Sequence, residues 1–473
     1  MLDFDTIVAL VYLFITLMLT LLVVASLAVA LHAERRWGTW FVPAIIPLMA
    51  LGIAVSTLFS DRELVFAERR IDLIAGRSGS GTAILQLITL SILSLAAAKL
   101  IGNFLRRENL PEAPGTPLAV ALLVYIVAGS FLPSAFGTVP TFVHTLIYPA
   151  LIFSAAWAAR RDAPEATVRA AKVALYAMMV GSLAAAVVVP DISVQPDYQS
   201  LLPGLTIRLW GLGSSPNSIG PMALLAALLE YLYPTRLRWL RAPLLLATGA
   251  VFILAQSRTV WLTLPMVLAI LGWYRWVRGR GLKPALVVVI ACIGAASAVL
   301  TALLFIDVLA LWERFTDTQL GATTTTLSGR TGIWDVALRE WLRNPLFGYG
   351  PAIWGSDFRT AIGMQYAVSA HNQFLQTLSS AGILGFLALL AYLRYLIPAV
   401  VRTAPATRGV SLALLGMVLF RCLTETPLSM TGIIQGDALT HFLLFAIALR
   451  APAPAERPVR VATVPGWSGA AWH

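Results

Sequence analysis

Long runs of apolar residues that carry almost no charge dominate this chain. Segments 7–31, 83–98 and 285–305 are clear examples. Roughly 20 such residues are needed to cross the hydrocarbon core of a bilayer. The runs are too long and too uniformly apolar for barrel strands, and backbone amides in lipid must be satisfied internally, so they favour helices. With 58% hydrophobic and 12% charged residues, a soluble globular fold is excluded. We expect an all-α polytopic membrane protein.

Hydropathy predicts about 12–13 transmembrane helices. Basic clusters fall between the apolar blocks, and the positive-inside rule places these clusters in the cytoplasm. The first six residues include two aspartates and no Lys or Arg, so the N-terminus is expected outside and the C-terminus inside. A large loop, 311–375, then lies outside the cytoplasm. The thirteen expected spans are 7–31, 40–58, 83–101, 117–133, 140–159, 171–189, 215–233, 242–257, 259–274, 284–309, 376–397, 409–426 and 437–449.

The net charge of +11 does not indicate a nucleic-acid partner, because the basic residues do not form one continuous face. The two cysteines, Cys292 and Cys422, both lie in apolar segments, so no disulfide framework is expected. We divide the chain into four parts. They are an N-terminal transmembrane bundle (1–200), a catalytic transmembrane region with the external loop (201–400), C-terminal transmembrane helices (401–450) and a disordered cytoplasmic tail (451–473).

Most of the polar chemistry lies in the large external loop. Its sequence Ser-Gly-Arg-Thr-Gly-Ile-Trp-Asp, residues 328–335, opens a predicted helix. One face is expected to be apolar and the other charged, which is typical of a helix in the membrane interface. Arg330 stands just before the first turn, where it and the helix amides could receive an anion together. The apolar face holds Trp334, Ala337, Leu338, Trp341 and Leu342, and the charged face holds Asp335, Arg339, Glu340 and Arg343.

Two further motifs follow in the same loop. In Asn-Pro-Leu-Phe-Gly-Tyr-Gly-Pro-Ala-Ile-Trp, residues 344–354, Gly348 and Gly350 indicate a turn where backbone can approach a ligand closely. The segment Ala-His-Asn-Gln-Phe-Leu-Gln, residues 370–376, leads into the next span. His371 is the one histidine of the loop and stands at the edge of the membrane. Further along, Arg421 and Glu425 are spaced i, i+4, and an ion pair between them is the simplest interpretation.

In this order, the three motifs resemble the signature of the O-antigen ligase and polymerase superfamily, multi-span glycosyltransferases with a GT-C-like architecture. The resemblance covers roughly residues 200–400 and includes a supporting element, residues 208–217, that begins at Arg208 and ends at Asn217. The version Gly-Tyr-Gly-Pro-Ala-Ile-Trp, residues 348–354, is most similar to polymerases of exopolysaccharide repeat units. The superfamily usually has an even number of spans and an N-terminus inside, whereas our count is odd.

The resemblance implies transfer of an oligosaccharide from undecaprenyl diphosphate to a sugar hydroxyl, with inversion and without cofactor or metal. Arginine pairs bidentately with phosphate oxygens, so arginines suit the leaving diphosphate. The matching residues are Arg330, Arg208 and Arg258 as diphosphate ligands, with Arg330 also counted as catalytic. His371 matches the histidine at the superfamily's catalytic centre, which acts either as the base that deprotonates the acceptor hydroxyl or as its hydrogen-bonding orienter; an imidazole ordinarily titrates near neutral pH. The expected supporting residues are Asn372 as the orienter of His371, Tyr349 and Trp354 as stacking partners for sugars, and Asn217.

Three functions remain open at this point. The first is a polymerase of lipid-linked repeat units for exopolysaccharide or O-antigen. The second is a ligase that transfers the glycan to lipid A core during lipopolysaccharide synthesis. The third is a transporter of lipid-linked sugar, but transport predicts ionisable residues spread through paired, broken membrane helices, and here they concentrate in one loop. We expect a multi-pass protein of the bacterial inner membrane with a periplasmic active site, and chain-length regulators or export proteins as possible partners.

Overall fold

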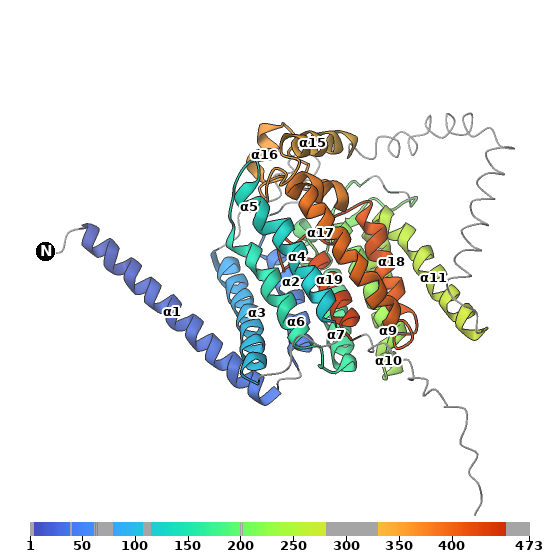
Figure 1. Cartoon of the computed structure of the whole chain (residues 1–473). Coiled ribbons are helices and arrows are strands. Elements are labelled where there is room, and N and C mark those ends of the chain that lie inside the picture. The colour runs from blue at the N-terminus through green and yellow to red at the C-terminus, as the bar shows by residue number, and fades with distance from the viewer. Residues whose placement is uncertain are drawn as a thin grey trace, which may run out of the picture.

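The computed structural model describes residues 4–37, 40–60, 62, 64, 79–106, 115–198, 200, 202–280 and 330–450 (Figure 1). Helices dominate these residues, and one two-residue ladder is the exception. In chain order the elements are α1 (Phe4–Trp37), α2 (Phe41–Leu58), α3 (Gly79–Leu105), α4 (Thr116–Ile126), a π-helical turn η2 (Val127–Phe131), α5 (Leu132–Phe136), a 3-10 turn η3 (His144–Leu146), α6 (Ile147–Ala158), α7 (Pro164–Val188), α8 (Pro190–Ser193), β1 (Val194–Gln195), β2 (Arg208–Leu209), α9 (Pro216–Leu232), α10 (Arg238–Leu254), α11 (Arg258–Gly279), α15 (Arg330–Arg343), α16 (Ser356–Ala361), α17 (Gln373–Thr403), α18 (Val410–Cys422) and α19 (Gly436–Ala448).

The predicted all-α polytopic membrane architecture is confirmed. Seven helices of the described residues are long and apolar enough to cross a bilayer: α1, α2, α3, the continuous run from α4 to α5, α7, α11 and α17. Every predicted span other than 284–309 overlaps a helix. Span 284–309, the first part of the predicted external loop (311–329) and the tail (451–473) lie outside the described residues.

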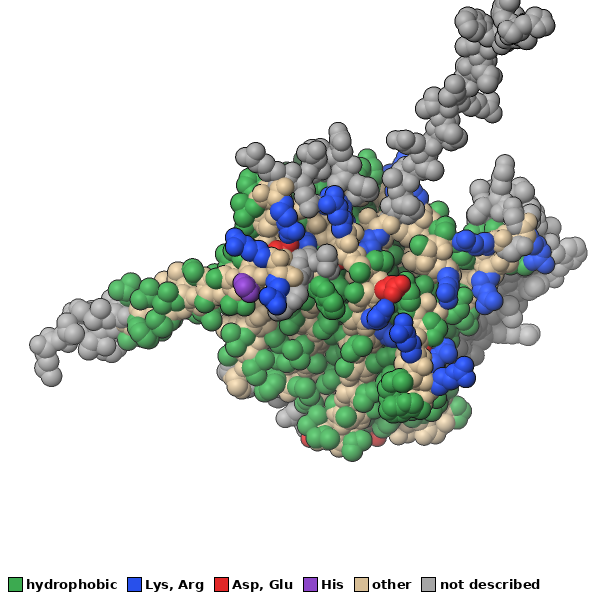
Figure 2. Space-filling view, turned by 90° about the horizontal axis from the view of Figure 1, so that it is seen from below, with side chains coloured by type: hydrophobic (Ala, Val, Ile, Leu, Met, Phe, Trp, Pro, Cys, Tyr) green, Lys and Arg blue, Asp and Glu red, His purple; other side chains and the backbone are tan. Residues whose placement is uncertain are grey.

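Helix α17 lies at the centre of the arrangement. It packs against α4, α15, α18 and α19. Elsewhere in the bundle, α2 packs against α3 and α7, and α11 packs against α18. Helix α1 contacts α3, and its N-terminal part extends away from the bundle (Figure 1). Seen from below, the end of the bundle opposite α15 and α16 carries many Lys and Arg side chains and few acidic ones (Figure 2). An end of this kind is what the positive-inside rule expects on the cytoplasmic side of a membrane protein.

Two glycine-dependent turns lock the loop after α15 onto α17. Gly382 has φ +63° within α17, and a Cβ there would overlap the carbonyl of Leu346. Gly348 has φ +70°, and its Cβ would come within 2.7 Å of the amide nitrogen of Gly382. The Tyr349 amide donates to the Ser379 carbonyl at 2.8 Å. The glycines of this motif therefore let backbone approach backbone in α17, whereas the sequence suggested approach to a ligand.

Helix α15 forms as predicted, but its buried face differs from the prediction. Ile333, Val336, Ala337 and Glu340 are buried, while Leu338 and Leu342 are exposed. The buried apolar residues pack with Trp354 and Phe358 in a small cluster that caps this end of the bundle. Glu340, expected on the charged face, is instead buried and paired with Arg343 at 2.7 Å. The leucines face outward, as expected where a helix meets lipid.

A short ladder fixes the position of Arg208. Strand β2 pairs antiparallel with β1, so that Arg208 stands opposite Gln195. The Arg62 guanidinium, which is 5% exposed, donates to the carbonyl oxygens of Ile192, Gly211 and Gly213 at 2.6–3.0 Å. A buried arginine that is satisfied by several carbonyls stabilises irregular backbone that would otherwise lack partners. The segment leading into α9 is thus held in one conformation.

We expect Gly382→Ala to destabilise the protein severely, because it adds a backbone clash to the strain of a positive φ. Gly363→Ala is the matched control: Gly363 has φ +68°, but no atom lies within 4 Å of the place that an added methyl group would take. Strain alone costs roughly 1–3 kcal/mol. Thermal unfolding of the full-length protein in detergent should show a much larger fall in Tm for Gly382→Ala, and equal falls would contradict the backbone-packing account.

Candidate active site

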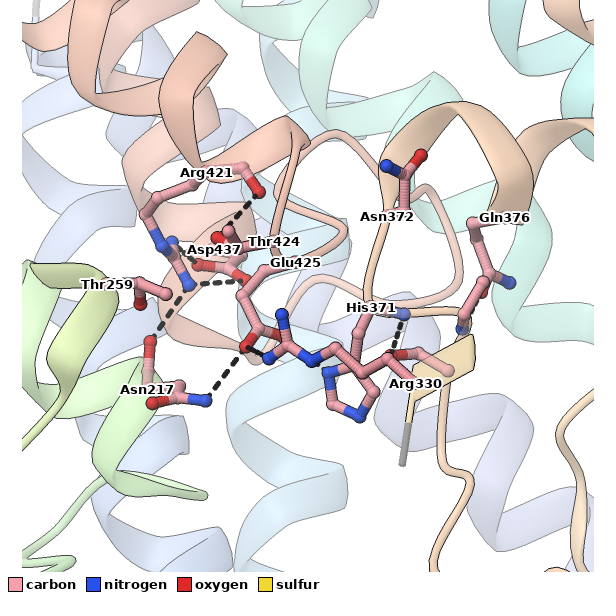
Figure 3. A network of polar contacts seen from close by, with 12 residues as sticks. Asn217, Thr259, Arg330, His371, Asn372, Gln376, Arg421, Thr424, Glu425 and Asp437 are labelled. Atoms are coloured by element: carbon pink, nitrogen blue, oxygen red, sulfur yellow. Dashed lines mark hydrogen bonds and ion pairs between the residues drawn. The ribbon is translucent and has the colours of Figure 1, made fainter. Parts of the chain in front are cut away.

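The carboxylate of Glu425, in the loop between α18 and α19, is the point where the candidate site converges. Its Oε2 lies 3.0 Å from Nδ1 of His371, and its Oε1 lies 3.3 Å from Nη2 of Arg330. Asn217 donates from Nδ2 to the same Oε1 at 2.8 Å. Figure 3 shows these side chains meeting from α9, α15, the start of α17 and the loop after α18. Three residues predicted from separate motifs are therefore joined by a fourth.

The backbone before α17 aims His371 at this carboxylate. His371 adopts φ +46°, a left-handed conformation that is uncommon outside glycine. Its amide donates to Oγ of Ser369 at 3.2 Å. The neighbouring Ala370 carbonyl accepts from the indole of Trp334 at 2.9 Å, which ties the histidine segment to α15. Two fixed contacts thus hold a strained residue, an arrangement that is common at functional sites.

A second set of contacts supports the site from behind. Arg421 is 2% exposed and pairs with the carboxylate of Asp437. Its Nη2 also donates to the Asn217 carbonyl at 2.9 Å, and Ser257 donates to the Asn217 side chain at 2.9 Å. The predicted ion pair between Arg421 and Glu425 is wrong. Because Arg421 has a closer acid in Asp437, Glu425 is available for His371 and Arg330.

Charge holds Glu425 in its ionised form. Burial alone would raise the pKa of this carboxyl, but the hydrogen bond from His371 and the charges of His371, Arg421 and Arg330 hold it below its ordinary value. A carboxylate on Nδ1 favours the tautomer in which Nδ1 carries the proton and Nε2 has a free lone pair. The pair can therefore present a base, with Nε2 of His371 as the proton acceptor.

The other two predicted arginines lie beside this group. Arg208 donates from Nε to the Ala255 carbonyl at 3.2 Å and lies over the Tyr198 ring, 4.6 Å from its centroid. Burial lowers the pKa of Arg208, the charge of Arg258 lowers it further, and Glu425 opposes this shift. Arg208 is thus within electrostatic reach of both Arg258 and the central carboxylate.

Arg258 stands at the first position of α11 and is exposed. Among the described residues its guanidinium has no hydrogen-bonding partner. A cation at a helix N-terminus is unfavourable, since this end of the helix already carries partial positive charge. An anion bound here would offset both charges, which makes the position suitable for a phosphate ligand.

The remaining predicted residues have other contacts in this structure. The Asn372 side chain accepts from the amides of Phe374 and Leu375 at 3.0 and 3.1 Å, so it caps α17 and does not contact His371. Glu425 occupies the orienting position that the sequence suggested for Asn372. Tyr349 packs on Phe358 with ring centroids 4.8 Å apart, and Trp354 is 5% exposed. Both aromatic rings therefore pack against other residues of the protein.

Glu425 is the functional candidate that the sequence did not single out. The one available signal was an acidic residue near the end of an apolar span, since such residues are costly in a membrane and commonly have a role. No group of three or more His, Cys, Asp or Glu side chains that could hold a metal occurs within the described ranges. Metal independence therefore stays a prediction.

Comparison with known families agrees with the motifs. Residues 243–390 match the family model described as O-antigen ligase. The match supports, at the level of the family, the O-antigen ligase and polymerase type of membrane glycosyltransferase. The matched range includes Arg258, Arg330 and His371, whereas Arg208, Asn217 and Glu425 lie outside it. No curated protein matches the chain.

We expect Glu425→Gln to lower the Tm at neutral pH, with a loss that shrinks in acid. Because the folded-state pKa of Glu425 is depressed, its stabilisation is fully present above the ordinary value of about 4.3 and is lost as pH falls through the lowered pKa. Thermal unfolding at pH 7 and below pH 4 measures the difference in Tm between the variant and the wild type. Glu165→Gln, in the exposed pair with Arg169, is the control; a Glu425→Gln gap that does not change with pH contradicts this account.

Proposed function

We propose that this protein is a glycosyltransferase that moves an oligosaccharide from undecaprenyl diphosphate to a glycan hydroxyl. The observation that carries the proposal is the contact of His371 with Glu425 beside Arg330, Arg208 and Arg258. A base and a cluster of arginines are the two parts that such a transfer needs. The family match supports this class of reaction.

His371 acts as the base in this mechanism. Its Nδ1 proton is held by Glu425, and Nε2 removes the proton from the acceptor hydroxyl as the oxygen attacks the anomeric carbon of the donor. The new bond forms on the face opposite the leaving group, so the configuration inverts. Glu425 stabilises the imidazolium that results, as a carboxylate does in other base–acid pairs. The C–O bond to the diphosphate breaks, and the electron pair leaves with the phosphate oxygen.

The arginines act on the leaving group. Negative charge builds on the bridging oxygen as the bond breaks, and pre-positioned cations stabilise it with little reorganisation. Arg330 uses one contact on Glu425 and keeps further N–H groups, because a guanidinium has five donors. Arg208 and Arg258 carry the remaining charge, so the donor's own diphosphate supplies the energy and no cofactor or metal enters.

We further propose that the acceptor is a lipid-linked repeat unit and that the site faces the periplasm of a bacterial inner membrane. The polymerase-like sequence 348–354 supports the first point. The Lys- and Arg-rich end opposite α15 supports the second (Figure 2). Chain-length regulators or export proteins are the expected partners of such a polymerase.

Deletion of the gene distinguishes polymerase from ligase. A polymerase predicts loss of high-molecular-weight polysaccharide, with single repeat units left on the lipid carrier. Electrophoresis of the polysaccharide and mass spectrometry of extracted lipid-linked glycans measure both. Long glycans that accumulate on undecaprenyl diphosphate and are missing from lipid A core would instead identify the ligase.

We expect His371→Ala to lower kcat by about 10²–10⁴-fold, the usual contribution of a positioned base, while donor binding is kept. His144→Ala is the control, since His144 contacts Tyr148 away from the site. Transfer from purified lipid-linked repeat unit and binding of undecaprenyl diphosphate give the two readouts. If His371→Ala keeps more than about a tenth of the wild-type rate, His371 is a positioning residue and not the base.

Arg330→Lys should remain poorly active although it keeps the charge, because an ammonium cannot reproduce the planar fork that binds two phosphate oxygens. Arg339→Lys, in an exposed pair with Asp335 on the same helix, should be nearly silent. The transfer assay is repeated with EDTA, which should have no effect. Normal turnover in Arg330→Lys, or a rate that EDTA abolishes and magnesium restores, contradicts the arginine mechanism.

A further inference from the structure

A cavity of about 340 Å³ lies next to the His371–Glu425 pair and is not used by the mechanism above. It is enclosed by the α4–η2 run, the first turns of α17, the segment after Gly350 and the loop that follows Glu425. Its volume is at the lower end of the range of about 300–1,000 Å³ that small-ligand sites occupy. The cavity is thus large enough for a sugar ring.

The lining of this cavity is polar but uncharged. None of the described residues that line it is Asp, Glu, Lys, Arg or His. Hydroxyl and amide groups come instead from Ser130, Ser369, Thr377, Gln376 and Gln435, among others. Such groups both donate and accept hydrogen bonds, as the hydroxyls of a sugar do. An ionised ligand would lose its hydration here without finding an opposite charge, so the cavity suits a neutral polyol and excludes a phosphate.

None of the three predicted arginines lines the cavity. In Figure 3, Gln376 lies on the far side of His371 from Asn217 and Thr259, and Arg330 extends from near Gln376 towards Glu425. Gln376, with Ser369 and Gln373, lines the cavity, whereas Thr259 follows Arg258 at the start of α11. The attacking hydroxyl must approach the anomeric carbon opposite the diphosphate. The cavity, whose described lining holds no charged side chain, therefore suits the acceptor better than the part of the site that holds the arginines.

One wall residue has an unused hydrogen-bond donor. Trp354 lines the cavity and is 5% exposed, and its indole Nε1 has no partner among the described residues. The ring packs edge-on against Phe358, with centroids 5.7 Å apart, which fixes its orientation. A buried donor without a partner costs about 1–3 kcal/mol, and a ligand hydroxyl would remove that cost.

We propose that this cavity binds the acceptor sugar, and that the sugar it accepts is uncharged. Trp354 donates from its indole to a hydroxyl of this sugar, and the neutral wall rejects a uronic acid at the same position. The inference rests on the proposed function, because it takes His371 as the base and the arginines as the diphosphate site. It adds a substrate class that neither the motifs nor the family match provides.

The test uses the full-length protein in lipid nanodiscs and two separate probes. Undecaprenyl diphosphate alone reports on the arginine side. Matched disaccharides that end in glucose, galactose or mannose, or in the corresponding uronic acid, report on the cavity through saturation-transfer NMR. At least one neutral disaccharide should bind, at least tenfold more tightly than its uronic acid. Trp354→Phe keeps the ring and removes the donor, so it should weaken that binding up to about tenfold and leave undecaprenyl diphosphate binding unchanged.

Trp341→Phe is the matched control, because the Trp341 indole donates to the Pro345 carbonyl outside the cavity, and it should bind both probes normally. Equal or tighter binding of a uronic acid, an unchanged affinity in Trp354→Phe, or no binding by any disaccharide overturns the inference. Failure of undecaprenyl diphosphate to bind, or binding that survives Arg330→Ala together with Arg208→Ala, overturns the proposed function instead. The two failures are therefore distinguishable.

Discussion

The buried carboxylate of Glu425 is the interaction on which the candidate site depends. It joins parts of the chain that are far apart in sequence, because Asn217 begins α9, Arg330 begins α15 and His371 precedes α17. A buried ion is tolerated only where charged or hydrogen-bonding partners surround it. Glu425 has three such partners, and each of them in turn loses its own acceptor if the carboxylate is removed. The arrangement of the site therefore depends on Glu425 being ionised.

The sequence predicted the parts of the site that depend on local pattern. Spans follow from hydropathy, and the start of α15 follows from the motif around Arg330. His371 follows from the resemblance of residues 370–376 to the superfamily's motif. The helical prediction succeeded because backbone in lipid has few alternatives. Arg330, His371 and Asn217 came from three separate motifs and do meet in space. A fixed order of motifs thus carried long-range information that periodicity alone does not hold.

The contacts that the sequence did not predict are set by competition in three dimensions. The spacing of Arg421 and Glu425 suggested a helical ion pair, but Asp437 lies closer to the arginine and takes its charge. Asn372 resembled an orienter of His371, yet its side chain satisfies the open amides of the α17 N-terminus. Gly348 suggested a ligand contact, and its space is filled by the backbone at Gly382. In each case the sequence predicted the kind of interaction that the residue makes, but the three-dimensional structure decided its partner.

Two parts of the candidate site near His371 differ in charge. Arg330 contacts Glu425, and Arg208 and Arg258 lie near each other beside this pair, so the described residues leave positive charge that a bound anion would neutralise. The described wall of the cavity has no Asp, Glu, Lys, Arg or His side chain. A lipid diphosphate and a sugar hydroxyl differ in this same respect, since one must be neutralised and the other must only be hydrogen-bonded. In the proposed mechanism, a diphosphate placed in the uncharged cavity would lose its hydration without finding an opposite charge, and this cost would favour binding beside the arginines.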